Sequence, residues 1–159
     1  MDKFDQIKLN QVAEVSHTIT EDDIQKFVDL TGDDNRLHVD ADFAAKTSFK
    51  KPVAHGMLGA SFISTVIGTK LPGDGALWFS QSLEFLLPVR VGDVLTIRAK
   101  VIKKDKRSRV IELDTSIINQ NRQKVIHGTA KVKIVEKIPL LKKEANIESI
   151  SKKALVIGG

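Results

Sequence analysis

The hydrophobic pattern of this chain changes its period near residue 75. Up to residue 70, after one short strand-like stretch at Ala13–Thr20, apolar residues recur at helical spacing. Beyond residue 76 they alternate with polar residues, as in strands that bury one face. The pattern predicts one strand, several helices and then an antiparallel meander, which places the chain in the α+β class.

The segment TEDDIQKFVDLTG carries both the start and the stop signals of a helix. Thr20 can cap the N-terminus, and Asp22 and Asp23 suit the positive end of the helix dipole. Gly32 can end the helix in a left-handed turn. Another short helix is predicted over Asp40–Lys46, so the polar stretch between the two is expected in irregular backbone.

The longest helix is predicted over Met57–Lys70. Its apolar positions are Met57, Leu58, Phe62, Ile63, Val66 and Ile67, and its other positions include the small residues Gly59, Ala60, Ser61, Ser64 and Thr65. A helix that is apolar or small on nearly every side is one that the rest of the domain encloses. The turn sequence LPGDG at Leu71–Gly75 follows it.

Four strands are predicted after that turn, over Ala76–Leu87, Val94–Lys103, Val110–Ile118 and Val125–Val135. In the last three, every second residue is apolar or small, which gives each strand one face for the core. The breaks KKDKRS and NQNRQ suit hairpin loops. We therefore expect a meander of long antiparallel strands that curls around the central helix.

Length and composition fit a single globular domain. The 159 residues suffice for a sizeable core, and no apolar run reaches the roughly 18–20 residues that span a bilayer. The N-terminus MDKFDQIKLN lacks the apolar core of a signal peptide, so we expect a cytoplasmic protein that does not engage a membrane. The absence of cysteine excludes disulfides, thiolate zinc sites and a cysteine nucleophile.

The net charge of +5 raises the question of nucleic acid. The basic residues are scattered and densest near the C-terminus, and the chain has one Trp and no Tyr for stacking on bases. We therefore expect solvated lysines and no nucleic-acid partner. A mildly basic surface also suits a phosphorylated, cofactor-like substrate or an acidic carrier protein.

The stretch TGDDNRLHVD at Thr31–Asp40 holds the first candidate chemistry. Asp33 and His38 are five residues apart, close enough to converge on one point, and an Asp beside an imidazole holds its tautomer for acid–base catalysis. Asn35 lies between them and can orient either one. The alternative is turn chemistry, because Asp and Asn side chains after a helix often bond to local backbone.

The stretch KPVAHGML holds the second candidate, directly before the long helix. Free N–H groups at a helix N-terminus carry positive partial charge and stabilise negative charge that develops on a carbonyl oxygen. Gly56 has no side chain to block a ligand carbonyl, although it also suits an ordinary helix start. His55 precedes it, as a second ligand-facing imidazole or as a residue that orients the start of the helix.

These stretches together resemble the MaoC-like dehydratase family, the R-specific enoyl-CoA hydratases. The motif Gly-Asp-x-Asn-x-x-His and the residues that follow it are matched by Gly32, Asp33, Asn35, His38, Asp40, Ala44, Phe49, His55, Gly56 and Met57. The later stretch LPGDGALWFSQSLEFLLPVRVGDVLTIRAKV is similar to the family as well, and the resemblance covers Val12–Val135. Arg36 departs from it, because the family usually has Pro there.

The resemblance implies a hotdog fold and a homodimer or higher homo-oligomer, with no cofactor. The implied substrate is a trans-2-enoyl thioester of coenzyme A or of an acyl carrier protein. In the implied roles, His38 takes a proton from water and Asp33 delivers one to the α-carbon. Asn35 orients the pair, and the Gly56 N–H stabilises the enolate oxygen.

The remaining candidates have weaker patterns. Ser61 lies one turn into the long helix, where it can line the site or pack in the core. His17 and His127 are expected to be structural or exposed. The four histidines lack metal-ligand spacing, so no metal site is expected.

Two rival functions share the same substrate class. A hotdog thioesterase would hydrolyse the thioester, but the Asp-x-Asn-x-x-His set argues against it. A non-catalytic acyl-thioester-binding domain is the other, and Arg36 is the one hint of it.

The C-terminal stretch raises a separate expectation. We divide the chain into a hotdog domain over residues 1–136 and a linker or tail over 137–159. The end, KKALVIGG, resembles the first strand and opening glycine of a short-chain dehydrogenase/reductase domain, or is a plain apolar strand. The fingerprint is incomplete, so no nucleotide binding is expected.

Overall fold

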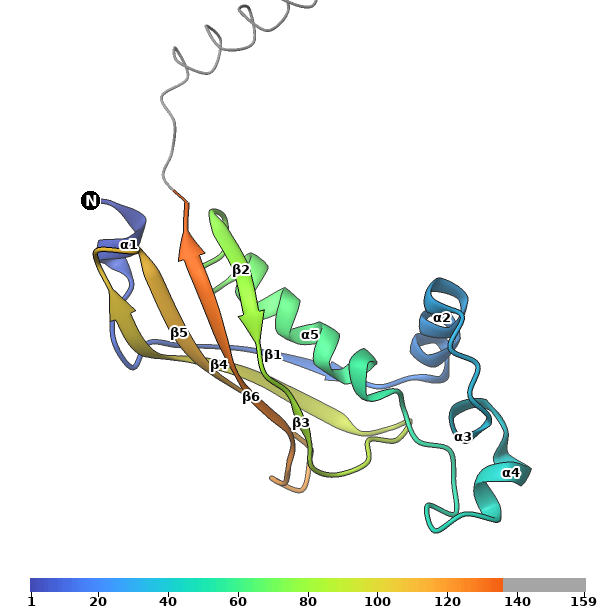
Figure 1. Ribbon diagram of the computed structural model, residues 1–159. Helices are drawn as coiled ribbons and strands as arrows, with labels where there is room; N and C mark the ends of the chain where they lie inside the picture. Colours follow the sequence, from blue (N-terminus) through green and yellow to red (C-terminus); the bar gives the residue numbers. More distant parts are fainter. Residues whose placement is uncertain (136–159) are drawn as a thin grey trace, which may run out of the picture.

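A single antiparallel sheet packs against one long helix in the computed structural model, which describes residues 1–135 (Figure 1). The sheet has the order β1-β4-β5-β6-β2, and the short strand β3 also pairs with β6. The elements are α1 (Lys3–Gln6), β1 (Val12–Thr18), α2 (Glu21–Thr31), α3 (Arg36–Val39), α4 (Ala41–Ala45), α5 (Gly56–Thr69), β2 (Ala76–Gln81), β3 (Glu84–Phe85), β4 (Val94–Asp105), β5 (Val110–Ile118) and β6 (Lys124–Ile134). This is the predicted hotdog arrangement, and α5 is its central helix.

The core lies between α5 and the inner face of the sheet. Each of the three long strands turns every second residue inward, and β4 shows this with Leu95, Ile97, Ala99 and Val101 all buried. From α5, Ile63, Val66 and Ile67 meet them. Each such side chain contributes about 1.5–3 kcal/mol when it leaves water, so the alternation predicted for these strands is confirmed and accounts for their register.

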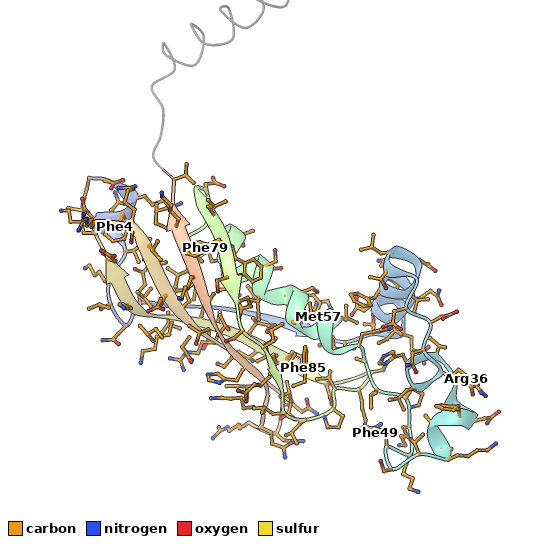
Figure 2. The ribbon with its side chains drawn as sticks, viewed as in Figure 1. Phe4, Arg36, Phe49, Met57, Phe79 and Phe85 are labelled. Carbon is orange, nitrogen blue, oxygen red and sulfur yellow. The ribbon has the colours of Figure 1, made fainter. Side chains whose placement is uncertain are left out.

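The N-terminal half places three short helices beyond one end of α5 (Figure 1). The helix α2 starts and ends as predicted: Thr20 and Asp23 form a capping box, and Gly32 adopts φ 77°. The helix α4 is capped by Asp40, whose Oδ1 accepts from Phe43 N at 3.0 Å. Figure 2 shows Arg36 and Phe49 at this end of the molecule and Phe4 at the other.

One predicted strand is wrong. Residues 76–87 form two strands, β2 and β3, which both pair with β6 and are interrupted at residues 82 and 83, next to Gly128. A Cβ on Gly128 would lie 1.7 Å from the main-chain oxygen of Ser82. Ser82 also bonds Thr129 through both its N–H and its hydroxyl, at 3.0 and 2.9 Å. The close approach needs a residue without a side chain, and it breaks the strand.

The irregular backbone expected through His38 is also corrected. Only the stretch from Asp33 to Asn35 is irregular, since Asn35 caps α3 by accepting from Leu37 N at 3.0 Å. His38 therefore stands on a helical turn. No helix among residues 1–135 is long and apolar enough to cross a membrane. The predicted tail and the domain boundary lie outside the described residues.

Candidate active site

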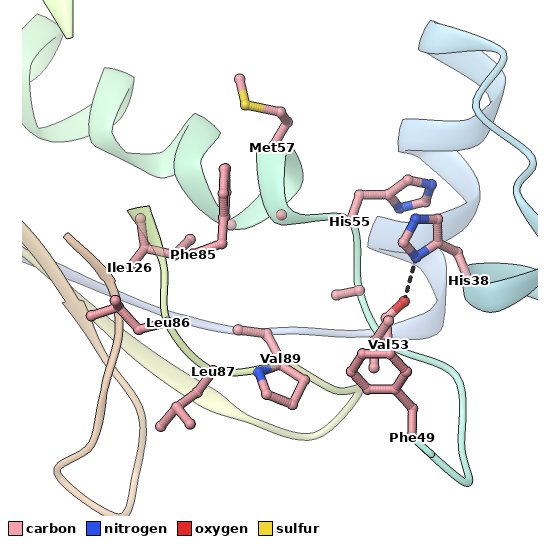
Figure 3. A pocket seen from close by; sticks show the side chains of 14 residues that line it. His38, Phe49, Val53, His55, Met57, Phe85, Leu86, Leu87, Val89 and Ile126 are labelled. Carbon is pink, nitrogen blue, oxygen red and sulfur yellow. Dashed lines mark hydrogen bonds between the residues drawn. The ribbon is translucent and has the colours of Figure 1, made fainter. Parts of the chain in front are cut away.

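A mainly apolar cavity of about 540 Å³ opens at the N-terminal end of α5 (Figure 3). Of its fourteen lining residues, His38 and His55 carry the polar side chains. The others are apolar or glycine and include Phe49, Phe85 and Ile126. A volume in the range of about 300–1,000 Å³ and an apolar wall with a few convergent polar groups are typical of small-molecule sites.

Three separate segments bring titratable side chains together beside this cavity, and two of them, His38 and His55, line it. Asp33 follows α2, His38 lies on α3 and His55 is the N-cap of α5. Their potential ligand atoms all lie within 4.8 Å of one another, and in residues 1–135 this is the one such cluster of three. One water molecule or one cation would be in reach of all three side chains.

The hydrogen bond of His38 decides which of its nitrogens can act. Its Nδ1 lies 2.7 Å from the carbonyl oxygen of Val53 (Figure 3). A carbonyl oxygen only accepts, so Nδ1 carries the hydrogen and Nε2 holds a free lone pair. A neutral imidazole in this tautomer is set up to take a proton at Nε2.

His55 is buried and holds the other two residues in place. Its side chain is 3% exposed, and its Nε2–H donates to the main-chain oxygen of Asp33 at 2.9 Å. Its ring lies 3.9 Å from the ring of His38 and 4.7 Å from that of Phe27, measured between centroids. His55 thereby fixes the backbone at Asp33. It also packs against one face of the His38 ring.

The Asp33 carboxylate stays accessible. Its side chain is 50% exposed, and its Oδ2 lies 4.0 Å from His55 Nε2. Its Oδ1 accepts from the Asn35 main-chain N–H at 3.2 Å. The predicted pair of Asp33 and His38 is therefore brought together, while the Asn35 side chain acts at the start of α3.

Arg36 is the first residue of α3, a position where Pro is also favoured. Its guanidinium bonds Asp40 at 3.2 Å and lies 4.6 Å above the Phe43 ring. The Phe43 backbone N–H first, and then Arg36, lower the pKa of Asp40 below its usual value. The charge of Arg36 is thus paired within α3 and α4.

Gly56 is the first residue of α5, so its N–H has no partner within the helix. The Phe85 ring closes over it, because a Cβ on Gly56 would lie 2.7 Å from two ring carbons. Only glycine allows this contact between α5 and β3. The predicted donor therefore lines the cavity, next to its apolar wall.

The structure does not bring Ser61 to the cavity. Ser61 is exposed on α5, and its hydroxyl donates to the Leu58 carbonyl at 2.5 Å. His17 and His127 also lie away from the cluster of three. Each pairs with a carboxylate at 2.7 Å, from Asp23 and Asp114 respectively.

The sequence interpretation missed three contributors. Val53 acts through its carbonyl, which any residue offers, so no side-chain signal marks it. Phe85 and Leu86 line the cavity although they were assigned to a plain strand. The signal that could have found them is the unbroken apolar run FLLPV, which alternation does not explain.

A family model described as MaoC-like domain matches residues 3–123. Among curated proteins, the (R)-specific enoyl-CoA hydratase of Rhodospirillum rubrum is 50% identical over 98 residues, 62% of this chain and 68% of that protein. The enzyme of the same name from Aeromonas caviae is 38% identical over 128 residues, which cover 80% of this chain and 96% of that protein. Among solved structures, the unliganded R-hydratase PhaJ1 of Pseudomonas aeruginosa superposes with a TM-score of 0.79 at 36% identity, over 86% of this chain and 90% of that one.

Proposed function

The chain belongs to the MaoC-like domain family, and from this membership we propose its function and the residues that perform it. The protein is an (R)-specific enoyl-CoA hydratase, a hydro-lyase that adds water to trans-2-enoyl thioesters and runs in reverse as a 3-hydroxyacyl thioester dehydratase. One observation carries the assignment of the site: a histidine with a free Nε2 stands beside an accessible carboxylate at the end of an apolar cavity.

The cavity suits the two ends of an enoyl thioester. Its apolar wall takes the acyl chain, and the thioester carbonyl points at the N–H of Gly56. This N–H lies at the positive end of α5, where it stabilises the oxygen that becomes negative during the reaction. The α- and β-carbons then lie near His38 and Asp33.

In the hydration direction, His38 starts as the neutral imidazole and Asp33 as the protonated carboxylic acid, and the two hold one water molecule between them. An O–H bond of the water breaks as its oxygen bonds the β-carbon, and the proton goes to His38 Nε2. The electron pair of the double bond moves to the thioester, and the α-carbon takes a proton from the Asp33 carboxyl. Transfer of the proton from His38 back to Asp33 restores both groups, so the net reaction adds one water.

The test compares Asp33→Asn and His38→Gln with the wild type on crotonyl-CoA. Loss of the enoyl absorbance reports hydration, an (R)-specific 3-hydroxyacyl dehydrogenase reports the product, and a thiol reagent reports thioester hydrolysis. Each substitution should lower turnover by about 10²–10⁴-fold, as expected for a general acid or base.

A matched control exists in His127 and Asp114, a histidine and a carboxylate that lie 2.7 Å apart outside the cavity. Asp114→Asn and His127→Gln should leave turnover unchanged. Near-native turnover in both site variants would refute the assignment, and release of free thiol would identify a thioesterase.

The cluster of Asp33, His38 and His55 could also hold a divalent cation, which is the second reading of the same geometry. Histidines that bind metals commonly donate their second N–H to a carbonyl, as both do here. Full activity after treatment with EDTA supports acid–base catalysis. Loss of activity that zinc or manganese restores would support a metal site.

We also propose a homodimer or higher homo-oligomer in the cytoplasm, acting on coenzyme A or carrier-protein thioesters. The strand β2 lies at one end of the strand order and exposes Leu77 and Phe79, which are 52% and 55% exposed. An open strand edge with exposed apolar residues is suited to pairing with a second copy. Light scattering coupled to size-exclusion chromatography tests it, and a monomer at micromolar concentration would contradict it.

A further inference from the structure

We propose that Arg90 is a positioning residue that keeps His38 in its reactive tautomer, acting through the loop 49–53. The inference deepens the proposed function and rests on it, because it assigns a purpose to the tautomer of the proposed base. Arg90 lies in the connection between β3 and β4, far from the signature stretch in the sequence. It lines no part of the apolar cavity.

The guanidinium of Arg90 binds three main-chain carbonyls of one loop. One terminal nitrogen donates to the oxygens of Lys51 and Pro52, at 2.8 and 3.2 Å. The other donates to the oxygen of Phe49 at 2.7 Å. A rigid, planar fork with several N–H groups makes this set possible, and a single ammonium group cannot reproduce its geometry.

The main chain at Arg90 is itself held by hydrogen bonds. The Arg90 main-chain N–H donates to the Asp93 carboxylate at 2.9 Å, and Asp93 N–H returns a bond to the Arg90 oxygen at 3.1 Å. The neighbouring Gly92 N–H donates to Ile19 at the end of β1, at 2.8 Å. Arg90 is therefore tied to the edge of the sheet, so its contacts hold the loop to a fixed part of the fold.

The loop needs such a hold because its conformation is locally unfavourable. Lys50 has φ 65°, in the left-handed region that residues with a side chain rarely adopt. The flanking residues close a tight turn, in which Lys51 N–H donates to the Phe49 oxygen at 2.8 Å. Loss of the three hydrogen bonds from Arg90 would therefore destabilise this conformation of the loop 49–53.

The loop transmits its position to His38 through Val53. The Val53 N–H donates to Leu37 at 3.2 Å, and its carbonyl accepts the Nδ1–H of His38 at 2.7 Å. If this carbonyl moves away, the hydrogen is free to occupy Nε2, and a histidine protonated at Nε2 cannot take a proton from water. Phe49 lies at the other end of the loop and lines the cavity, so the same shift also changes substrate binding.

The test uses Arg90→Gln and Arg90→Lys in the full chain, with Arg109→Lys as the matched control. Arg109 also bonds a main-chain carbonyl and a second group, Ile134 and Asp2, but at the opposite end of the sheet. Imidazole nitrogen NMR reports the tautomer of His38, whose signals are identified by their loss in His38→Gln. Steady-state kinetics on crotonyl-CoA give kcat and KM, and thermal melting selects folded variants.

In the wild type and in Arg109→Lys, His38 should be protonated at Nδ1. In Arg90→Gln it should become a mixture of tautomers, and kcat should fall by about 10–100-fold, in line with small displacements of catalytic groups. KM should rise less, and Arg90→Lys should lie in between. Unchanged His38 signals with kcat within about twofold of wild type in the folded Arg90 variants would overturn the proposal.

The two hypotheses fail in different ways. If the wild type does not hydrate enoyl thioesters, the proposed function fails, while the NMR signals still report whether Arg90 sets the tautomer. If the wild type is active and the signals of Arg90→Gln are unchanged, only the role of Arg90 fails.

Discussion

Replacing Phe85 by alanine should shift the enzyme towards longer acyl chains. Figure 3 shows Phe85 and Ile126 at the end of the cavity remote from His38, which is where a lengthening acyl chain leads. The Phe85 ring packs against Gly56 and is 51% exposed. Alanine removes this wall and leaves the rest of the lining unchanged.

The magnitude follows from the apolar area that the longer chain gains. Each methylene that leaves water contributes about 0.8 kcal/mol, which corresponds to about fourfold in kcat/KM. Octenoyl-CoA has four more methylenes than crotonyl-CoA, and we expect only part of them to gain contact in the opened cavity. The ratio of the two kcat/KM values should therefore rise by about tenfold. Because the ring is half exposed, its removal should cost the fold less than about 2 kcal/mol.

The assay measures kcat/KM for crotonyl-, hexenoyl- and octenoyl-CoA with the wild type, Phe85→Ala and Phe85→Leu. Ile102→Ala is the control, because Ile102 is exposed to a similar 47% but lies on β4 outside the cavity. Leucine should give an intermediate ratio, and the control should give the wild-type ratio. An unchanged ratio in a folded Phe85→Ala variant would show that the acyl chain does not run towards β3.

Three further outcomes are expected. Gly128→Ala should cost at least about 4 kcal/mol of unfolding free energy in urea, because its Cβ would collide with the Ser82 carbonyl; native stability would contradict the close approach of Ser82 to Gly128. Arg36→Pro should leave kcat/KM unchanged and stability within about 1 kcal/mol, since Pro suits the first position of α3; a tenfold loss of kcat/KM, about 1.4 kcal/mol, would place Arg36 in the site. Burial raises the pKa of Asp23, but the hydrogen bonds from His17 and from the α2 cap outweigh it, so the net pKa is lowered. The stability that this gives is fully present above about pH 4 and is lost as pH falls through the folded pKa. The difference in melting temperature between Asp23→Asn and the wild type should therefore be smaller at pH 3 than at pH 7, and an equal difference at both would refute it.

Much of the fold was determined by local properties of the sequence. Alternation identified β4, β5 and β6 together with the faces that they bury, and the Thr20 and Gly32 signals bounded α2. These inferences succeeded because burial period and capping depend on residues a few positions apart. The resemblance of the signature stretch to a known family led to Asp33 and His38 for the same reason, since the residues lie within six positions.

The break between β2 and β3 could not be predicted in this way. It depends on a contact between Ser82 and Gly128, which are 46 positions apart. No local sequence signal near residue 82 predicts this contact. The same holds for His55, whose bond to Asp33 joins residues 22 positions apart. From the sequence it was a candidate for orienting the start of a helix, and the fold makes it the third member of the site.

The amino-acid sequence was thus enough to identify Asp33 and His38 as candidate acid–base residues and the class of domain that carries them. Which nitrogen of His38 is free depends on the folded chain, because the Val53 carbonyl that sets the tautomer is a main-chain group without a sequence signal. The tertiary structure also brought Arg90 to a loop 41 positions away at Phe49. Residue type sets the chemistry that a side chain can do, whereas the direction of a hydrogen bond depends on where the folded chain places its partner.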